Sequence, residues 1–246
     1  MSGTRSPFRT APAIDRAALI VAHGSPSDPW PQERAVAELA VRVSACLPGW
    51  EVRGTTLAAP GRFEAVCSAM PRPVLLPFFM ASGWFTTRAL PCRAAPFDVA
   101  LLEPFGLHPT LPALAAARIA DTIAPDDLPG CQILIAAHGS RTARGSAEAT
   151  VRFTAALSGL LPCPSARIGF LEEAPYIADV ARGMGRNALC LPLFALSSGH
   201  VTEDLPRALD SAGFAGSVLP PLIDWPEVPA LLGEAIARTR SLAPCP

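Results

Sequence analysis

The sequence predicts an α/β protein of two similar, doubly wound lobes that face one another, each a parallel sheet flanked by helices. Three observations carry this prediction. A series of sequence markers occurs twice in the same order, short apolar runs alternate with helical segments in both halves, and 246 residues suffice for two lobes of about 120 residues. Continuous apolar runs joined by helical crossovers are typical of buried parallel strands.

The duplication is clearest in the tetrapeptide Ala-His-Gly-Ser, which stands at 22–25 and again at 137–140, each time at the end of an apolar run. Further pairs follow at nearly the same offset: LLPFFMASGW (75–84) with CLPLFALSSGH (190–200), Leu-Pro at 90–91 with 205–206, and EPFGLHP (103–109) with PPLIDWP (220–226). We therefore expect a polar tail over 1–16, a first repeat over 17–125, a linker around 124–130 and a second repeat over 131–246.

The strands and helices follow from the spacing of apolar residues. Apolar runs predict strands near 18–22, 52–57, 73–79 and 98–102, and again at 132–137, 166–171, 188–196 and 216–221. Helical spacing in the second half marks 149–161, 176–184, 202–212 and 227–240. Pro77 and Pro192 argue against regular central strands at those places, but both copies share the feature.

Composition excludes several classes of function. Arginine supplies all 20 basic residues and lysine is absent, which removes Schiff-base chemistry and a P-loop. A net charge of -1 argues against a nucleic acid as the main partner. No apolar window is long enough for a membrane span, so we expect a soluble, cytoplasmic protein. The seven cysteines form no C-x-x-C pair, which disfavours iron–sulfur clusters, zinc knuckles and a disulfide framework.

Three polar residues follow the first three predicted strands of the second half: His138, Glu172 and His200. Ligands of open α/β sheets bind outside the carboxyl ends of the strands, and neighbouring strands lie about 4.8 Å apart, so these side chains can converge. Two imidazoles and one carboxylate suit a divalent metal such as Co²⁺, Fe²⁺, Ni²⁺ or Zn²⁺. A loop residue that caps a helix explains any single one of them equally well, whereas three at equivalent strand ends favour a metal site.

The first half keeps only part of this set. His23 matches His138, but Glu172 pairs with Leu57 or with Ala58, depending on the register. This half therefore cannot build the same site, and we expect it to supply the opposite wall.

In the same alignment His200 pairs with Trp84. An indole is no metal ligand, because its only nitrogen is a hydrogen-bond donor. Trp84 and Phe85 would instead suit the face of a flat aromatic ligand, with ordinary core aromatics as the alternative.

The two Ala-His-Gly-Ser strand ends, the run Phe170-Leu171-Glu172 and the segment from Leu-Pro-Leu-Phe through Ser-Gly-His200 to Asp204-Leu205-Pro206 resemble class II tetrapyrrole chelatases. Within that family the chain is most similar to the sirohydrochlorin cobaltochelatase and ferrochelatase branch, over nearly all of its length beyond the N-terminal tail. The resemblance implies two flavodoxin-like lobes, a tetrapyrrole in the cleft between them, and metal insertion without ATP or an organic cofactor.

The resemblance also implies roles for individual residues. The metal-binding and catalytic set becomes His138, Glu172 and His200, although Glu173 competes with its neighbour for the role of acidic ligand. A neutral imidazole can both bind the metal and accept a pyrrole proton, and the carboxylate can take the second proton.

Substrate-binding roles are expected of Trp84, His23, Arg141 and Arg144. The two arginines, which are candidates for the carboxylates of sirohydrochlorin, could equally be ordinary surface residues. Co²⁺ would place the protein in cobalamin synthesis and Fe²⁺ in sirohaem synthesis, and both a monomer and a homodimer are compatible with the duplication.

Two other functions stay open. A noncatalytic tetrapyrrole- or metal-binding relative is compatible with the degenerate first half, although the second-half triad is intact. A hydrolase with Ser140 as its nucleophile is disfavoured because the sequence around that serine has no Gly-x-Ser-x-Gly elbow.

Overall fold

Two parallel sheets form the centre of the computed structural model, which describes residues 16–141, 144–162, 166–197 and 199–241 and, of Arg144, His200, Arg240 and Ser241, only the backbone. The first sheet has the order β2-β1-β3-β4, with β1 at Ala17–Ala22, β2 at Glu51–Thr56, β3 at Val74–Pro77 and β4 at Ala100–Leu101. The second has the order β6-β5-β7-β8, with β5 at Gln132–Ala137, β6 at Arg167–Phe170, β7 at Ala188–Pro192 and β8 at Ser217–Val218. The predicted α/β fold with one parallel sheet in each half is confirmed.

The central strands are apolar because both of their faces are covered. Every residue of β1 is at most 2% exposed, which requires helices on both sides of the sheet. The third strand of each sheet is shorter than the apolar run predicts and ends at Pro77 or Pro192. Proline has no N–H to continue the ladder, so it fits at this last position of a central strand.

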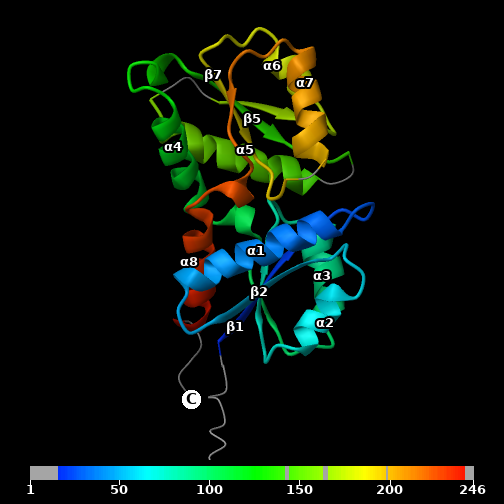
Figure 1. Cartoon of the computed structure of the whole chain (residues 1–246). Helices are drawn as coiled ribbons and strands as arrows, with labels where there is room; N and C mark the ends of the chain where they lie inside the picture. The colour runs from blue at the N-terminus through cyan, green and yellow to red at the C-terminus, as the bar shows by residue number, and fades with distance from the viewer. Residues whose placement is uncertain (1–15, 142–143, 163–165, 198, 242–246) are drawn as a thin grey trace, which may run out of the picture.

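Helices and short helical turns connect the strands (Figure 1). In the first half they are α1 (Trp30–Cys46), α2 (Arg62–Ser68), the π-helical turn η1 (Phe85–Ala89), α3 (Leu90–Ala94), the 3₁₀ turn η2 (Phe105–Leu107) and α4 (Leu111–Thr122). In the second half they are η3 (Leu128–Gly130), α5 (Arg144–Ser158), α6 (Ile177–Ala181), the π-helical turn η4 (His200–Asp204), α7 (Leu205–Ser211), η5 (Leu222–Asp224) and α8 (Val228–Ser241). The duplicated Leu-Pro begins α3 and α7, where a proline in the first turn costs no hydrogen bond.

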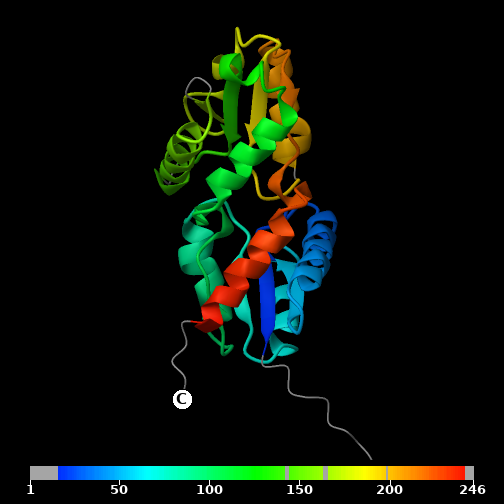
Figure 2. The ribbon, with the colours of Figure 1, turned by 90° about the vertical axis from the view of Figure 1, so that its left-hand side faces the viewer.

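The two lobes exchange their last helices. The red helix α8, from the end of the chain, lies against α1 in the first lobe, whereas α4 of the first half lies against α5 in the second lobe (Figures 1 and 2). One hydrophobic core consequently runs through both lobes and includes Ile20 of β1 and Ile135 of β5. Separate clusters cover the other face of each sheet, under α2 and α3 in the first lobe and under α6 and α7 in the second.

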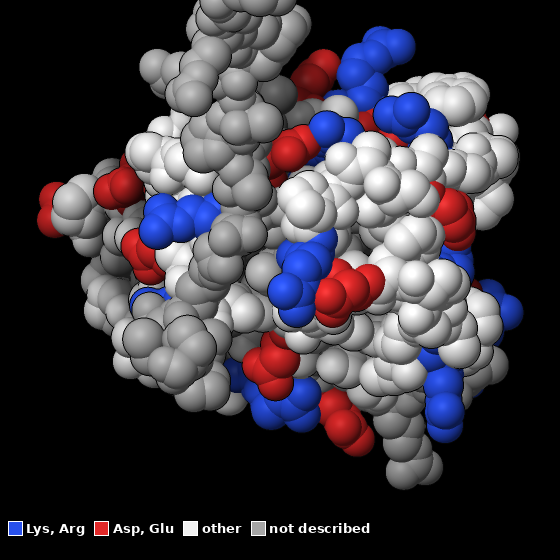
Figure 3. Space-filling view, turned by 90° about the horizontal axis from the view of Figure 1, so that it is seen from below, with Lys and Arg blue, Asp and Glu red and all other residues white. Residues whose placement is uncertain are grey.

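Charged side chains of both signs lie at the outer end of the first lobe (Figure 3). Seen from below, the end of the first lobe carries acidic and basic side chains side by side, without a broad region of one sign among the described residues (Figure 3). None of the described helices is long and apolar enough to cross a membrane.

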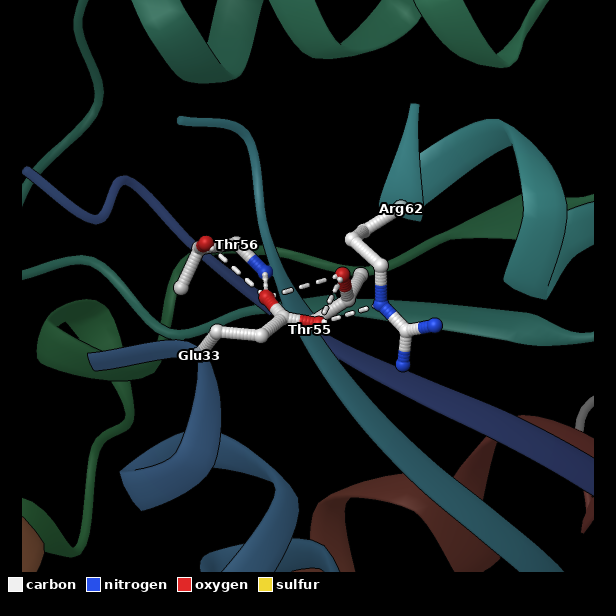
Figure 4. Close-up of polar contacts among 4 residues, drawn as sticks. All are labelled: Glu33, Thr55, Thr56 and Arg62. Carbon is white, nitrogen blue, oxygen red and sulfur yellow. Dashed lines mark hydrogen bonds and ion pairs between the residues drawn. The ribbon is translucent and has the colours of Figure 1, made fainter. Parts of the chain in front are cut away.

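A buried carboxylate fixes the first turn of α1 to the end of β2 (Figure 4). Glu33 is 6% exposed and accepts hydrogen bonds from the Thr56 backbone N–H at 2.6 Å, the Thr56 hydroxyl at 2.9 Å and the Thr55 hydroxyl at 3.0 Å. The Nε of Arg62 adds an ion pair at 3.3 Å. These donors satisfy the charge, so burial of the carboxylate is compatible with a stable fold.

Candidate functional site

Each Ala-His-Gly-Ser motif forms a tight turn directly after the first strand of its sheet. Gly24 and Gly139 have φ values of +78° and +73°, a left-handed conformation that favours glycine. A Cβ at Gly24 would come within 2.8 Å of the Thr56 Cβ, and one at Gly139 within 2.9 Å of the Glu173 Cγ. The glycine therefore lets the turn fold back beside the next strand, with the histidine at the strand end.

The two histidines adopt matching arrangements. The Nδ1–H of His23 donates to the Gly24 carbonyl at 2.6 Å, and the Nδ1–H of His138 donates to the Gly139 carbonyl at 2.9 Å. A carbonyl can only accept, so a neutral ring in this arrangement leaves the lone pair on Nε2. Metal-binding histidines commonly hold the other ring nitrogen in this way.

The two adjacent glutamates have different surroundings. Glu172 lines the cleft and forms an ion pair with Arg141, with 3.1 Å between Nε and Oε2. Glu173 accepts a hydrogen bond from the backbone N–H of Ser140 at 2.8 Å and so holds the turn after β5. The geometry favours Glu172 as the carboxylate that meets a ligand and gives Glu173 a part in positioning the turn of His138.

Backbone hydrogen bonds identify the counterpart of Glu172 in the first half. The N–H of Glu172 donates to the His138 carbonyl at 3.0 Å, and the N–H of Ala58 donates to the His23 carbonyl at 2.9 Å. Ala58, not Leu57, therefore stands in the place of the carboxylate. The first half has a methyl group where the second has a charge.

The pairing of His200 with Trp84 is wrong by one residue. The π-helical turns η1 and η4 begin at Phe85 and His200, and the helices after them begin at Leu90 and Leu205. Both pairs keep the 115-residue offset of the strands, so Phe85 is the counterpart of His200. The sequence alignment matched Ser-Gly with Ser-Gly and had to insert a gap that the structure does not contain.

Phe85 and Trp84 form an aromatic group on the first-half wall. The ring of Phe85 meets that of His23 edge to face with 4.0 Å between centroids, and Trp84 meets Phe85 at 5.1 Å. Trp84 is 65% exposed, which excludes the alternative that it is a core residue.

A cleft of about 970 Å³ between the lobes brings these groups together. Its walls come from both halves and are largely apolar, with Phe78, Phe79, Met80, Leu193, Phe194 and Leu196 among the lining residues. This volume lies at the upper end of the range for small-molecule sites. A ligand with a large apolar surface fits such a space better than a small polar one.

The cleft also contains most of the residues that were predicted for the site. His23, His138, Glu172, Arg141 and Trp84 all line it. The side chains of His200 and Arg144 lie outside the described residues, and the backbone puts them at the starts of η4 and α5. Among the side chains that the structure describes, no group of three His, Cys, Asp or Glu could hold a metal ion.

Burial sets the protonation of the first-half histidine. Desolvation lowers the pKa of His23 below its ordinary value, the hydrogen bond to the Gly24 carbonyl opposes this, and the nearby His138 lowers it further. The ring of His23 is therefore neutral at neutral pH.

Several polar lining residues were not predicted from the sequence, Gln32 and Asp204 among them. Gln32, in the first turn of α1, and Asp204, at the end of η4, both line the cleft. The position of Gln32 offered a signal, since the helix after the first strand of an α/β sheet begins beside the ligand crevice. Asp204 belongs to the segment that carries the family resemblance, but it was given no role.

Comparisons with known proteins agree with this geometry. A family model described as CbiX matches residues 132–239. A solved structure of CbiX, described as the terminal enzyme for biosynthesis of siroheme in denitrifying bacteria, has 47% identity and a TM-score of 0.82, covering 91% of this chain and 99% of that one. No curated protein matches the sequence.

More distant structures share the fold. SirB from Bacillus subtilis with Fe³⁺ has 14% identity and a TM-score of 0.69, over 92% of this chain and 98% of its own. The sirohydrochlorin chelatase SirB from Bacillus subtilis subspecies spizizenii, in complex with cobalt, has 13% identity and a TM-score of 0.64, over 92% and 97%. At 47% identity over nearly the full length of both proteins, the likeness to CbiX is one of family as well as of fold. The chain therefore belongs to the CbiX family of class II tetrapyrrole chelatases.

Proposed function

We propose that the protein inserts a divalent metal, Fe²⁺ or Co²⁺, into sirohydrochlorin without ATP. The observation that carries the proposal is the cleft itself, where His138 and Glu172 follow adjacent strands and lie among apolar walls large enough for a macrocycle. Of the two metals, Fe²⁺ is favoured by the description of the 47% identical relative as an enzyme of siroheme biosynthesis.

His200 completes the proposed ligand set through the repeat. In the first half Phe85 takes the place of His200, and His23 takes the place of His138. The ring centroids of Phe85 and His23 are 4.0 Å apart. The backbone gives His200 the corresponding first position of η4, and we infer that it acts as the third ligand. Two imidazoles and one carboxylate make an incomplete shell that can hold a metal and give it up again.

Proton transfer follows from the same groups. The macrocycle loses two pyrrolic protons as the metal enters, and neutral imidazoles and a carboxylate can accept them at neutral pH. His23, whose lowered pKa keeps its ring neutral, offers an acceptor on the first-half wall. Arg141, beside Glu172, is the candidate for a carboxylate of the substrate.

The test is anaerobic incubation of the protein with sirohydrochlorin and either Fe²⁺ or Co²⁺, followed by absorption spectroscopy. The proposal predicts conversion of the free-base spectrum to that of a metal complex, faster than without protein, and no conversion after chelation of the metal. A spectral change that shows binding of the macrocycle, with no acceleration of metal insertion, would identify a noncatalytic binding relative instead.

A further inference from the structure

One polar side chain that lines the cleft has a buried oxygen without a hydrogen-bond partner among the described residues. Gln32 is 7% exposed, and its Oε1 is buried without a hydrogen-bond partner among the described residues. A buried polar atom without a partner destabilises the folded state, so native structures rarely keep one without reason.

Other buried polar groups of the cleft are satisfied within the protein. The Thr150 hydroxyl donates to the Ser146 carbonyl at 3.0 Å, and the Thr86 hydroxyl donates to the Gly83 carbonyl at 3.1 Å while accepting from the Gly83 N–H. Gln32 differs from them because its oxygen is buried without a partner among the described residues, in a residue that lines a cavity a ligand can enter.

The position of Gln32 is held from the next residue along the chain. The Glu33 carboxylate is fixed to β2 by hydrogen bonds from Thr55 and Thr56, and its backbone N–H donates to the Pro29 carbonyl at 3.0 Å. These contacts hold the backbone of the first turn of α1, and with it the Cα of Gln32, beside the end of β2.

The arrangement belongs to the first half alone. Val36, Leu39 and Val43 are buried on α1, and Thr150, Phe153 and Leu157 are buried at the same spacing on α5, each 114 positions later. This register puts Ser146 opposite Gln32 and Ala147 opposite Glu33. The wall that lacks the carboxylate of the metal site therefore has an acceptor of its own.

We infer that Gln32 is a substrate-binding residue whose amide oxygen accepts a hydrogen bond from a polar hydrogen of the bound substrate. This inference rests on the proposed function, which supplies two sources of such a hydrogen. One is a pyrrolic N–H of the free-base tetrapyrrole, and the other is a water molecule on the incoming metal ion. An amide oxygen at this place favours the substrate that still has its proton, because a metallated macrocycle has lost its pyrrolic N–H groups.

The test replaces Gln32 with methionine, which has nearly the same shape and no acceptor amide. The control is Gln132→Met. Gln132 is the first residue of β5, at the end of the strand away from His138, and its amide oxygen accepts a hydrogen bond from the Gly185 N–H. Three quantities are measured for each protein: the melting temperature without ligand, the Kd of sirohydrochlorin without metal, and the Kd of Co²⁺ without sirohydrochlorin.

We expect Gln32→Met to keep or raise the melting temperature, because it removes an unsatisfied buried atom. One of the two Kd values should rise roughly three- to tenfold, and which one rises identifies the source of the hydrogen. The control should leave both Kd values unchanged. Unchanged Kd values in Gln32→Met, or a lower melting temperature with both affinities reduced alike, would overturn the inference.

The same measurements separate this inference from the proposed function. If wild-type protein binds sirohydrochlorin and Gln32→Met binds sirohydrochlorin and Co²⁺ with the wild-type affinities, only the role of Gln32 is contradicted. Wild-type protein that binds neither ligand contradicts both.

Discussion

His23 and His138 are equivalent in the repeat and differ in what stands beside them. His138 has Glu172 at the end of the next strand, where His23 has Ala58. The sequence predicts these positions well, because a polar residue directly after a buried strand must lie at the edge of the sheet. It could not reveal Gln32, since one polar residue in the first turn of a helix resembles many others until its burial is known.

Trp84 is expected to contribute to binding of the macrocycle. Its indole is exposed on the wall of the cleft, so a bound macrocycle can cover it. Removing about 60–100 Å² of apolar contact corresponds to about 1.5–2.5 kcal/mol. Trp84→Ala should therefore weaken sirohydrochlorin binding by tenfold or more in a fluorescence or absorbance titration, with metal binding nearly unchanged. Equal affinity in the variant and wild type would leave Trp84 without a role in binding.

The lowered pKa of His23 gives a prediction for stability. The unfolded chain takes up a proton on this histidine near pH 6.5, whereas the folded protein does so only at lower pH. The folded state therefore loses stability as the pH falls below about 6.5, and burial of His108, whose pKa is also lowered, adds to the loss.

Denaturant unfolding of wild type and His23→Gln at pH 7.5 and 5.5 measures this effect. The decrease in unfolding free energy between pH 7.5 and pH 5.5 should be smaller in the variant. Part of the decrease should remain, because His108 is still present. An identical loss in the two proteins would show that His23 titrates normally in the folded state.

At the scale of elements, the two π-helical turns show what a repeat does and does not specify. The duplicated Leu-Pro begins both α3 and α7, but the spacing of apolar residues predicted a helix only at the second of these places, within 202–212. The alignment in front of them failed by one residue, because similar short loops can be matched in more than one way. The backbone elements remove the ambiguity and assign Phe85 to the place of His200.

The Glu33 cluster predicts an asymmetry between the first helices of the two halves. Glu33→Ala leaves the hydroxyl of Thr55 and the N–H of Thr56 without their acceptor inside the protein. We expect a loss of about 2–4 kcal/mol in unfolding free energy, measured by urea denaturation. The control Glu148→Ala removes an exposed carboxylate of α5 and should change little. Equal effects would mean that the buried cluster contributes no net stability.

For the whole molecule, the exchanged helices decide how the halves depend on one another. The duplication predicted two lobes, but a repeat does not show which copy a helix packs against. Leu111 and Ile119 of α4 and Leu232 and Ile236 of α8 all belong to the core that runs through both lobes. The repeats 17–125 and 131–246, which we propose as the evolutionary units, are thus interlocked in space.

This interlocking predicts that neither repeat is stable alone. Residues 17–125 without α8 expose the apolar face of α1 that this helix covers. The fragment should show no cooperative unfolding by circular dichroism, whereas coexpression with residues 131–246 should restore a folded complex. Cooperative unfolding of the isolated fragment would show that its own core suffices.

We propose that the second half holds the metal site and that the first half supplies the opposite wall. This arrangement is tested most directly by the anaerobic rate of sirohydrochlorin metallation in wild type, His138→Ala and His23→Ala, with circular dichroism to establish that each variant is folded. We expect His138→Ala to lose most activity, by roughly 10²-fold or more, because it removes a metal ligand and a base. His23→Ala, whose strand end has no carboxylate partner, should retain a substantial part. Equal losses of activity in the two variants, or near-full activity in His138→Ala, would contradict a metal site in the second half.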